Sequence, residues 1–129
     1  YGCPILFKTG DKSSLTISSV LSHEVIELYI NPYIKLWAEG PVTDEGCEYA
    51  FEVCDPVEAD VYQIKLPNNQ GSVSVSNFVY PEYFNSSSEP STKFDHLNLL
   101  KNPFTMTASG MQLQKVANSG DETVYKRRS

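Results

Sequence analysis

Short runs in which apolar and polar residues alternate recur along most of the chain, separated by turn residues such as Pro, Gly, Asn and Asp. This period of two is typical of β-strands that bury one face. The 48–54 run is the clearest, because Tyr49, Phe51 and Val53 share a face. The pattern predicts strands over 4–8, 14–21, 24–30, 33–39, 48–54, 60–66, 72–80, 111–116 and 123–127.

Two segments depart from this alternation. Residues 81–93 show no period and are rich in Ser, which predicts a long surface loop. Residues 95–101 are predicted to form one short helix, with Asp95 as its N-cap and a proline just after its end. A helix is an alternative for residues 22–30, because their apolar positions nearly fit one helical face. Their β-branched content favours a strand.

The predicted elements indicate the fold class. About eight or nine short strands and one short helix predict an all-β fold of two packed antiparallel sheets. A β-sandwich or jelly roll is the first expectation, and a small closed barrel is the second. The 129 residues suit a single domain over 1–129, because two separate cores would each be too small to be stable.

The composition supports a folded chain and narrows its partners. The sequence is 40% hydrophobic and 12% aromatic, which is enough for a core. Its net charge of −6 disfavours nucleic acid and anionic membranes, and no apolar run is long enough to cross a bilayer. We therefore expect no nucleic-acid or membrane partner, and a monomer. The chain begins at Tyr1 without Met or an apolar leader, which favours a mature secreted protein.

The three cysteines limit the possible disulfides. On one extended strand over 48–54, Cys47 and Cys54 would lie about 23 Å apart, at ~3.3 Å per residue, and point to opposite faces. They are too distant to pair with each other. We expect a bridge from Cys3 to one of them, with Cys54 as the candidate partner. The alternative is three reduced, buried cysteines.

The sequence holds no recognisable catalytic or metal-binding motif. The stretch from His23 to Glu27 is similar to the zinc-protease helix motif, but Glu27 stands where that motif has a second His, and a strand is predicted there. We therefore expect His23 to be an exposed residue at a strand entrance, and His96 to be a surface residue or partial cap. Since no Gly-x-Ser-x-Gly turn or phosphate-binding glycine loop occurs, we expect neither an enzyme nor a cofactor.

Acidic residues are concentrated in the middle of the chain. Between Leu36 and Ile64 there is no Lys or Arg, and half of all the acids lie there, including Asp44 and Glu45 in a predicted loop. Such loops suit Ca²⁺, and a carboxylate pair suits a glycosidase, but neither spacing is specific. We favour a solvated acidic face that keeps the protein soluble or meets a basic partner.

The end of the chain has the opposite charge. Lys126, Arg127 and Arg128 form a local basic patch. We favour a solvated chain end whose charges keep an edge strand from pairing with another chain. The alternative is contact with an acidic partner.

Aromatic residues supply a further candidate binding surface. Tyr29, Tyr33 and Trp37 recur at a spacing of four, which places them on one face of an unbroken strand. An exposed row of this kind would bind sugar rings or a protein hot spot. The alternative, which we favour, is that this face is buried too.

The first residues, Tyr1-Gly2-Cys3, are similar to the aromatic-x-Cys start of small secreted effectors of plant-pathogenic fungi. The chain's small size, few cysteines and β-rich pattern resemble the avirulence effectors of rust fungi, one type of which has a cupin-like jelly roll. The His-x-His motif of catalytic cupins does not occur. The resemblance implies a protein released into host tissue, with entry into the host cytoplasm as a further step. A plant immune receptor would recognise its surface.

Three hypotheses for function follow. The first is a secreted virulence effector that acts by binding host proteins. The second is a carbohydrate-binding module that uses Tyr29, Tyr33 and Trp37. The third is a hydrolase with an unrecognised carboxylate pair, which needs a cleft in which two acids converge.

Overall fold

One helix, α1, and six short strands organise the part of the chain that the structure describes. The computed structural model describes residues 16–41, 46–89, 91–116 and 122–126, the last range by its backbone only. Strands β1 (Trp37–Glu39), β2 (Cys47–Ala50), β5 (Met111–Val116) and β6 (Glu122–Lys126) form an antiparallel sheet in the order β1-β2-β5-β6. Strands β3 (Val61–Lys65) and β4 (Ser72–Ser76) form a separate antiparallel hairpin. Three 3₁₀ turns complete the elements: η2 (Asp55–Val57), η3 (Pro67–Asn69) and η4 (Pro81–Phe84).

Helix α1 spans Ile17–Ile30 and replaces two predicted strands. A capping box begins it, since Thr16 Oγ1 accepts the Ser19 N–H and Ser19 Oγ accepts the Thr16 N–H. It ends at Asn31, the residue before Pro32. The strands predicted over 14–21 and 24–30 are therefore wrong where the chain is described, and the helical alternative for 22–30 is confirmed. The β-branched preference for strands is small enough for capping and tertiary contacts to override it.

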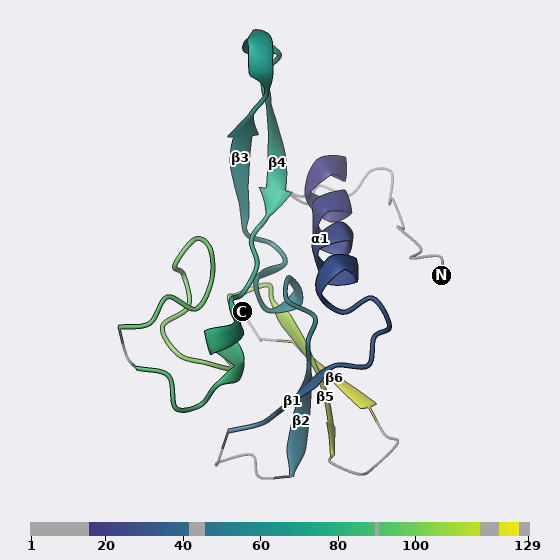
Figure 1. Ribbon diagram of the computed structural model, residues 1–129, viewed down its shortest axis with the longest axis vertical. Helices are drawn as coiled ribbons and strands as arrows, with labels where there is room; N and C mark the ends of the chain where they lie inside the picture. Colours follow the sequence, from purple (N-terminus) through teal and green to yellow (C-terminus); the bar gives the residue numbers. More distant parts are fainter. Residues whose placement is uncertain (1–15, 42–45, 90, 117–121, 127–129) are drawn as a thin grey trace.

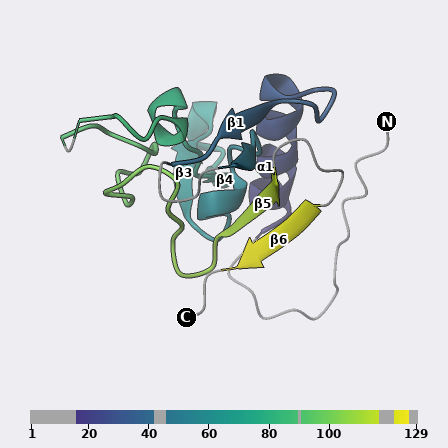
Figure 2. The ribbon, with the colours of Figure 1, turned by 90° about the horizontal axis from the view of Figure 1, so that it is seen from below.

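The two sheets lie at opposite ends of the molecule. Figure 1 shows the β3–β4 hairpin at the top, α1 beside its base, and the four-stranded sheet at the bottom. From below, β5 and β6 run side by side in Figure 2. A mostly β structure with two antiparallel sheets is therefore confirmed. The expected face-to-face sandwich or cupin-like jelly roll is not confirmed.

The hydrophobic core explains this arrangement, because loops supply most of it. The larger buried cluster combines Val53, Cys54 and Val57 after β2 with residues after β4, and Phe84 links it to a second cluster around Tyr49. Core side chains on irregular backbone give no period of two, so the sequence pattern did not locate them. The loop-derived members of the larger cluster after β4 are Val79, Tyr83, Phe94 and Leu100.

The strand predictions succeed where residues alternate without interruption. The predicted strand 111–116 is confirmed, and those over 60–66, 72–80, 48–54 and 33–39 are present in shortened form. The β3–β4 register places Tyr62 opposite Val75 and Ile64 opposite Val73. The prediction over 123–127 is confirmed for its described part, and 4–8 lies outside the described residues.

The helix predicted over 95–101 is wrong. Asp95 instead forms an isolated bridge with Val79, and its fully buried carboxylate accepts the N–H groups of Leu99 and Leu100 and the side-chain amide of Asn77. These bonds organise a loop, because a short acceptor side chain offers the backbone an alternative to helical pairing.

We predict that Asp95→Ala will lower the free energy of unfolding by about 2 kcal/mol or more, because it leaves buried donors without an acceptor. Urea denaturation will measure the change. The control is Glu89→Ala, on an exposed residue, which should shift stability by less than about 0.5 kcal/mol. Equal effects of the two variants would contradict this account of the loop.

Candidate functional site

Helix α1 turns mainly polar residues inward, apart from Ile26, which packs on the core, and turns most of its apolar residues outward. Ser19 and Glu27 are 2% and 9% exposed. On the opposite side, four apolar side chains are between 47% and 67% exposed: Ile17, Leu21, Val25 and Leu28. This is the reverse of a usual surface helix, which packs its apolar stripe against the core. Both faces therefore need an explanation.

The inner face of α1 is held by polar contacts to the segment after β2. His23 Nε2 lies 3.3 Å from Glu27 Oε1, one helical turn away, and 3.0 Å from Asp55 Oδ1. The same Glu27 oxygen accepts the Cys54 backbone N–H at 3.1 Å. The expectation of an exposed His23 at a strand entrance is therefore wrong: the side chain is 13% exposed and lies on a helix.

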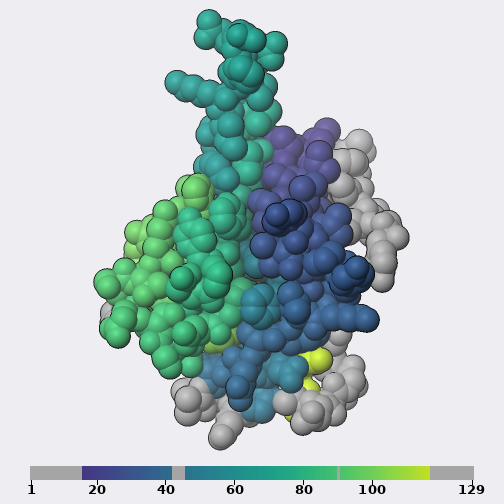
Figure 3. Space-filling view, in the orientation of Figure 1, coloured from purple at the N-terminus to yellow at the C-terminus, as the bar shows by residue number. Residues whose placement is uncertain are grey.

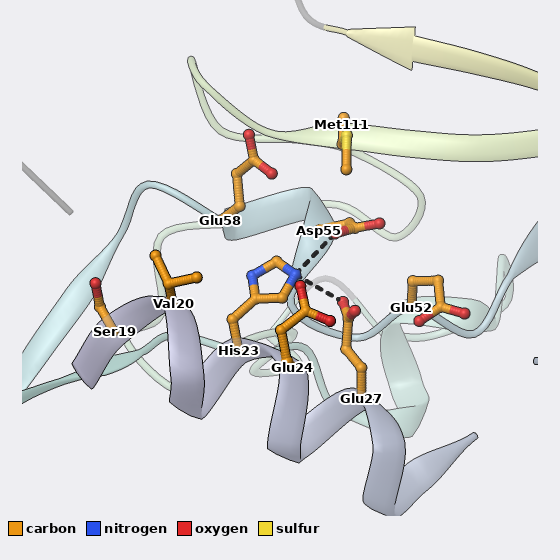
Figure 4. Close-up of a pocket in the computed structure, with 9 residues that line it drawn as sticks. All are labelled: Ser19, Val20, His23, Glu24, Glu27, Glu52, Asp55, Glu58 and Met111. Carbon is orange, nitrogen blue, oxygen red and sulfur yellow. Dashed lines mark ion pairs between the residues drawn. The ribbon is translucent and has the colours of Figure 1, made fainter. Parts of the chain in front are cut away.

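A pocket opens beside this contact. It has a volume of about 340 Å³, and Figure 4 shows its lining side chains converging from α1, from the segment after β2 and from β5. Five of the lining residues carry a carboxylate, one is His, and none is Lys or Arg. The lining residues are Ser19, Val20, His23, Glu24, Glu27, Glu52, Asp55, Glu58 and Met111.

Electrostatics in the pocket favour bound protons. Burial opposes the charge on His23, but its hydrogen bonds to Asp55 and Glu27 and their negative charges outweigh this and raise its pKa to about 10. Burial, the charge of Glu27 and a hydrogen bond with it raise the pKa of Glu52 to about 8. Burial and the charge of Asp55 also raise the pKa of Glu27, although His23 opposes them. Both carboxyl groups therefore bind a proton more tightly than they would in water.

Cys54 directly precedes the pocket-lining Asp55 and is fully buried with a free thiol. Burial and the charge of Glu27 raise the pKa of this thiol. A donor atom of His23, one of Glu27 and Sγ of Cys54 all lie within 4.8 Å of one another. The pocket thus brings nitrogen, oxygen and sulfur donors together.

The converging acids bear on the hydrolase hypothesis. The carboxyl groups of glycosidases lie about 5–9.5 Å apart with the sugar bond between them. In this pocket Glu27 lies close enough to Glu52 to raise its pKa, and Glu27 is also paired with His23. The acids here thus interact mainly with one another and with His23.

The predicted aromatic row is not formed. Tyr29 lies on α1, Tyr33 in the turn after it, and Trp37 on β1, so the three do not share one strand. Tyr29 and Tyr33 are exposed, but Lys115 Nζ lies over the Trp37 ring at 4.2 Å from its centroid. Because Lys115 covers this face of the Trp37 ring, a sugar ring cannot stack on the same face.

Several other predicted residues fall outside the described part of the chain. These are Asp44, Glu45, Arg127, Arg128 and Cys3. Lys126 ends β6, where only the backbone is described.

His96 differs from its expected role as a surface residue at the start of a helix. Its Nδ1 lies 3.0 Å from the Tyr80 hydroxyl, and its ring stacks on Phe78 with centroids 5.1 Å apart. The half-buried His96 is thus a packing residue at the base of the β3–β4 hairpin.

Sequence reasoning missed the pocket, although one signal was present. A spacing of four between His23 and Glu27 places both on one side of a helix, and the strand prediction concealed it. Nothing in the sequence indicated that Glu52 and Asp55 would meet them, since this depends on how α1 packs.

Comparisons with protein-family models, with curated proteins and with solved structures found no match to this chain. In the described part of the chain, no helix combines the length and the apolar character needed to span a bilayer.

We predict that the free energy of unfolding will fall as pH rises from about 5 to about 10. Both His23 and Glu52 have a higher pKa in the folded state than their ordinary values of 6.5 and 4.5. The folded state therefore binds more protons than the unfolded chain, and this stabilisation is lost as pH passes about 8 for Glu52 and about 10 for His23.

Urea denaturation at a series of pH values will test this prediction. The variant Glu52→Gln should flatten the profile mainly below pH 8, because it removes one of the groups whose pKa is raised on folding. A wild-type profile that stays level between pH 7 and pH 10 would contradict the assignment of a charged His23.

Proposed function

We propose that this protein acts by binding another protein through the outer face of α1. The observation that carries this proposal is the exposure of four apolar side chains on one side of the helix, at Ile17, Leu21, Val25 and Leu28. Figure 3 shows α1, in purple and blue, at the surface of the molecule.

These side chains form a continuous stripe. Their spacings of four, four and three keep them within about a quarter of the helix circumference, at ~100° per residue, along about 16 Å. Tyr29 extends the stripe one turn beyond Val25 and is 86% exposed. The stripe is therefore shaped for a partner helix or strand that lies along α1.

The energetics favour a partner. Burying an exposed Leu or Val side chain contributes about 1.5–3 kcal/mol, and monomeric proteins seldom expose contiguous apolar patches without a role. The helix does not use these side chains for its own packing, because its inner face is the polar one. Association with a partner would remove these side chains from water.

Charge indicates the chemistry of the partner. The chain has a net charge of −6, α1 contains no Lys or Arg, and Glu24 borders the stripe. A second copy would bring two acidic chains together. We therefore assign the stripe to a different protein, one with an apolar surface flanked by Lys or Arg.

The resemblance to fungal effectors extends this proposal. A secreted effector that binds host proteins, and is recognised by a plant immune receptor, needs an accessible surface and no catalytic site. We propose that the α1 stripe is the surface it uses. The carbohydrate hypothesis has less support, because the three aromatic residues on which it depends lie on separate elements.

We predict that the protein will bind a short synthetic peptide of Leu and Lys with helical periodicity more tightly than a matched peptide of Leu and Glu. Fluorescence anisotropy of labelled peptides will measure both affinities. Replacing Leu21 and Val25 together by Ser should weaken binding at least about tenfold, because it removes apolar area from the stripe.

The control variant is Leu99→Ser, at a residue that is 47% exposed and lies in the irregular segment between η4 and β5. It should leave the affinity unchanged. Equal binding of the two peptides would overturn the assignment of a basic partner. A dimer in sedimentation that the Leu21→Ser, Val25→Ser variant dissociates would assign the stripe to a second copy instead.

Expression inside plant cells that carry matched immune receptors tests the effector role. We expect a receptor-dependent immune response to the wild-type protein, reduced by the Leu21→Ser, Val25→Ser pair and retained by Leu99→Ser. If no receptor in a wide panel triggers a response, the effector role is contradicted. The peptide-binding result would be unaffected.

A further inference from the structure

We propose that the inner face of α1 carries a binding site for a divalent transition-metal ion of the Zn²⁺ class, formed by His23, Glu27, Cys54 and Asp55. The site lies on the side of α1 opposite the apolar stripe, so it is independent of the proposed protein-binding function.

The donor atoms are already close together. Donor atoms of His23, Glu27 and Cys54 lie within 4.8 Å of one another. The fourth donor, Asp55 Oδ1, is 3.0 Å from His23 Nε2. Around a tetrahedral Zn²⁺ the ligand atoms lie about 3.3–3.8 Å apart. The donors of His23, Glu27 and Cys54 would therefore draw closer together around an ion, and Asp55, which contacts His23, would turn toward them as the fourth ligand.

Two pairs of neighbouring residues supply the donors. His23 and Glu27 are one helical turn apart, and Cys54 and Asp55 are consecutive at the start of η2. The Cys54 N–H donates to Glu27 Oε1 and fixes the distance between the two pairs. Glu27, Cys54 and Asp55 are all buried, so the protein holds the donors in place before any ion arrives.

The kinds of donor atom select the metal. Ca²⁺ and Mg²⁺ prefer sites made of oxygen, whereas imidazole and thiolate are ligands of Zn²⁺ and its transition-metal neighbours. A fully buried thiol beside an imidazole and two carboxylates therefore points to Zn²⁺. This combination of nitrogen, sulfur and oxygen donors distinguishes the site from a solvated group of acids.

An ion has a route to these donors. They line or adjoin the open pocket of about 340 Å³, whose lining also includes Glu24, Glu52 and Glu58. Carboxylates around a cavity concentrate cations within it. The approach is therefore favourable for a cation.

Titration of the reduced, full-length protein with Zn²⁺ by calorimetry, and with Co²⁺ by absorption spectroscopy, tests the proposal. We expect one ion per chain and a Co²⁺ complex with a thiolate-to-metal charge-transfer band and tetrahedral d–d bands. Cys54→Ser should abolish the charge-transfer band and weaken Zn²⁺ binding at least about tenfold, in line with the loss caused by altering even the outer shell of a zinc site.

Two controls accompany this variant. Cys47→Ser changes the other described cysteine, and the Leu21→Ser, Val25→Ser pair changes the opposite side of α1; both should bind Zn²⁺ as the wild type does. If Cys54→Ser does not fold, the wild-type Co²⁺ spectrum decides the question, because a complex without a thiolate band overturns the site. The proposal is also overturned if the wild type does not bind Zn²⁺ or if Cys54→Ser binds it with wild-type affinity. The cluster would then be an internal ion-pair network.

Discussion

The ion pairs of His23 with Glu27 and Asp55 hold α1 against the segment that follows β2. This contact acts together with Ile26, which packs on the larger core cluster, and with Ser22, which accepts the Ser76 N–H, because most other apolar side chains of the helix are exposed. Removing charged groups from water is costly, and their mutual attraction offsets that cost only when the geometry is good and the remaining lone pairs are satisfied. The Cys54 N–H donates to Glu27, and the Asn31 side-chain amide donates to the nearby Glu52. These hydrogen bonds satisfy some of the carboxylate lone pairs.

The orientation of α1 gives its two faces different roles. The inner face gathers titratable groups in a pocket, where burial and mutual repulsion make them hold protons. The outer face keeps apolar side chains in water. The observed orientation thus leaves an apolar stripe in water and buries carboxyl groups, and these are the two surfaces for which we propose binding partners.

The sequence predicted strands well where apolar and polar residues alternate without interruption, as for β5 and the β3–β4 hairpin. It failed for α1, whose period was obscured because polar residues rather than apolar ones face inward. The buried Asn77–Asp95 pair and the core residues in loops produce no periodic pattern in the sequence, because tertiary contacts determine their positions. For the pocket, only the spacing of His23 and Glu27 was visible in advance.

The β3–β4 hairpin has a consequence for how this protein can change over generations. All of its residues from 63 to 72 are exposed, and the tip projects beyond the body of the molecule in Figure 1. Adding or removing two residues from each strand would keep every side chain on its own face, because the pairing repeats every two residues. The exposed end of the hairpin can therefore lengthen or shorten without disturbing the core, so insertions and deletions should be tolerated there.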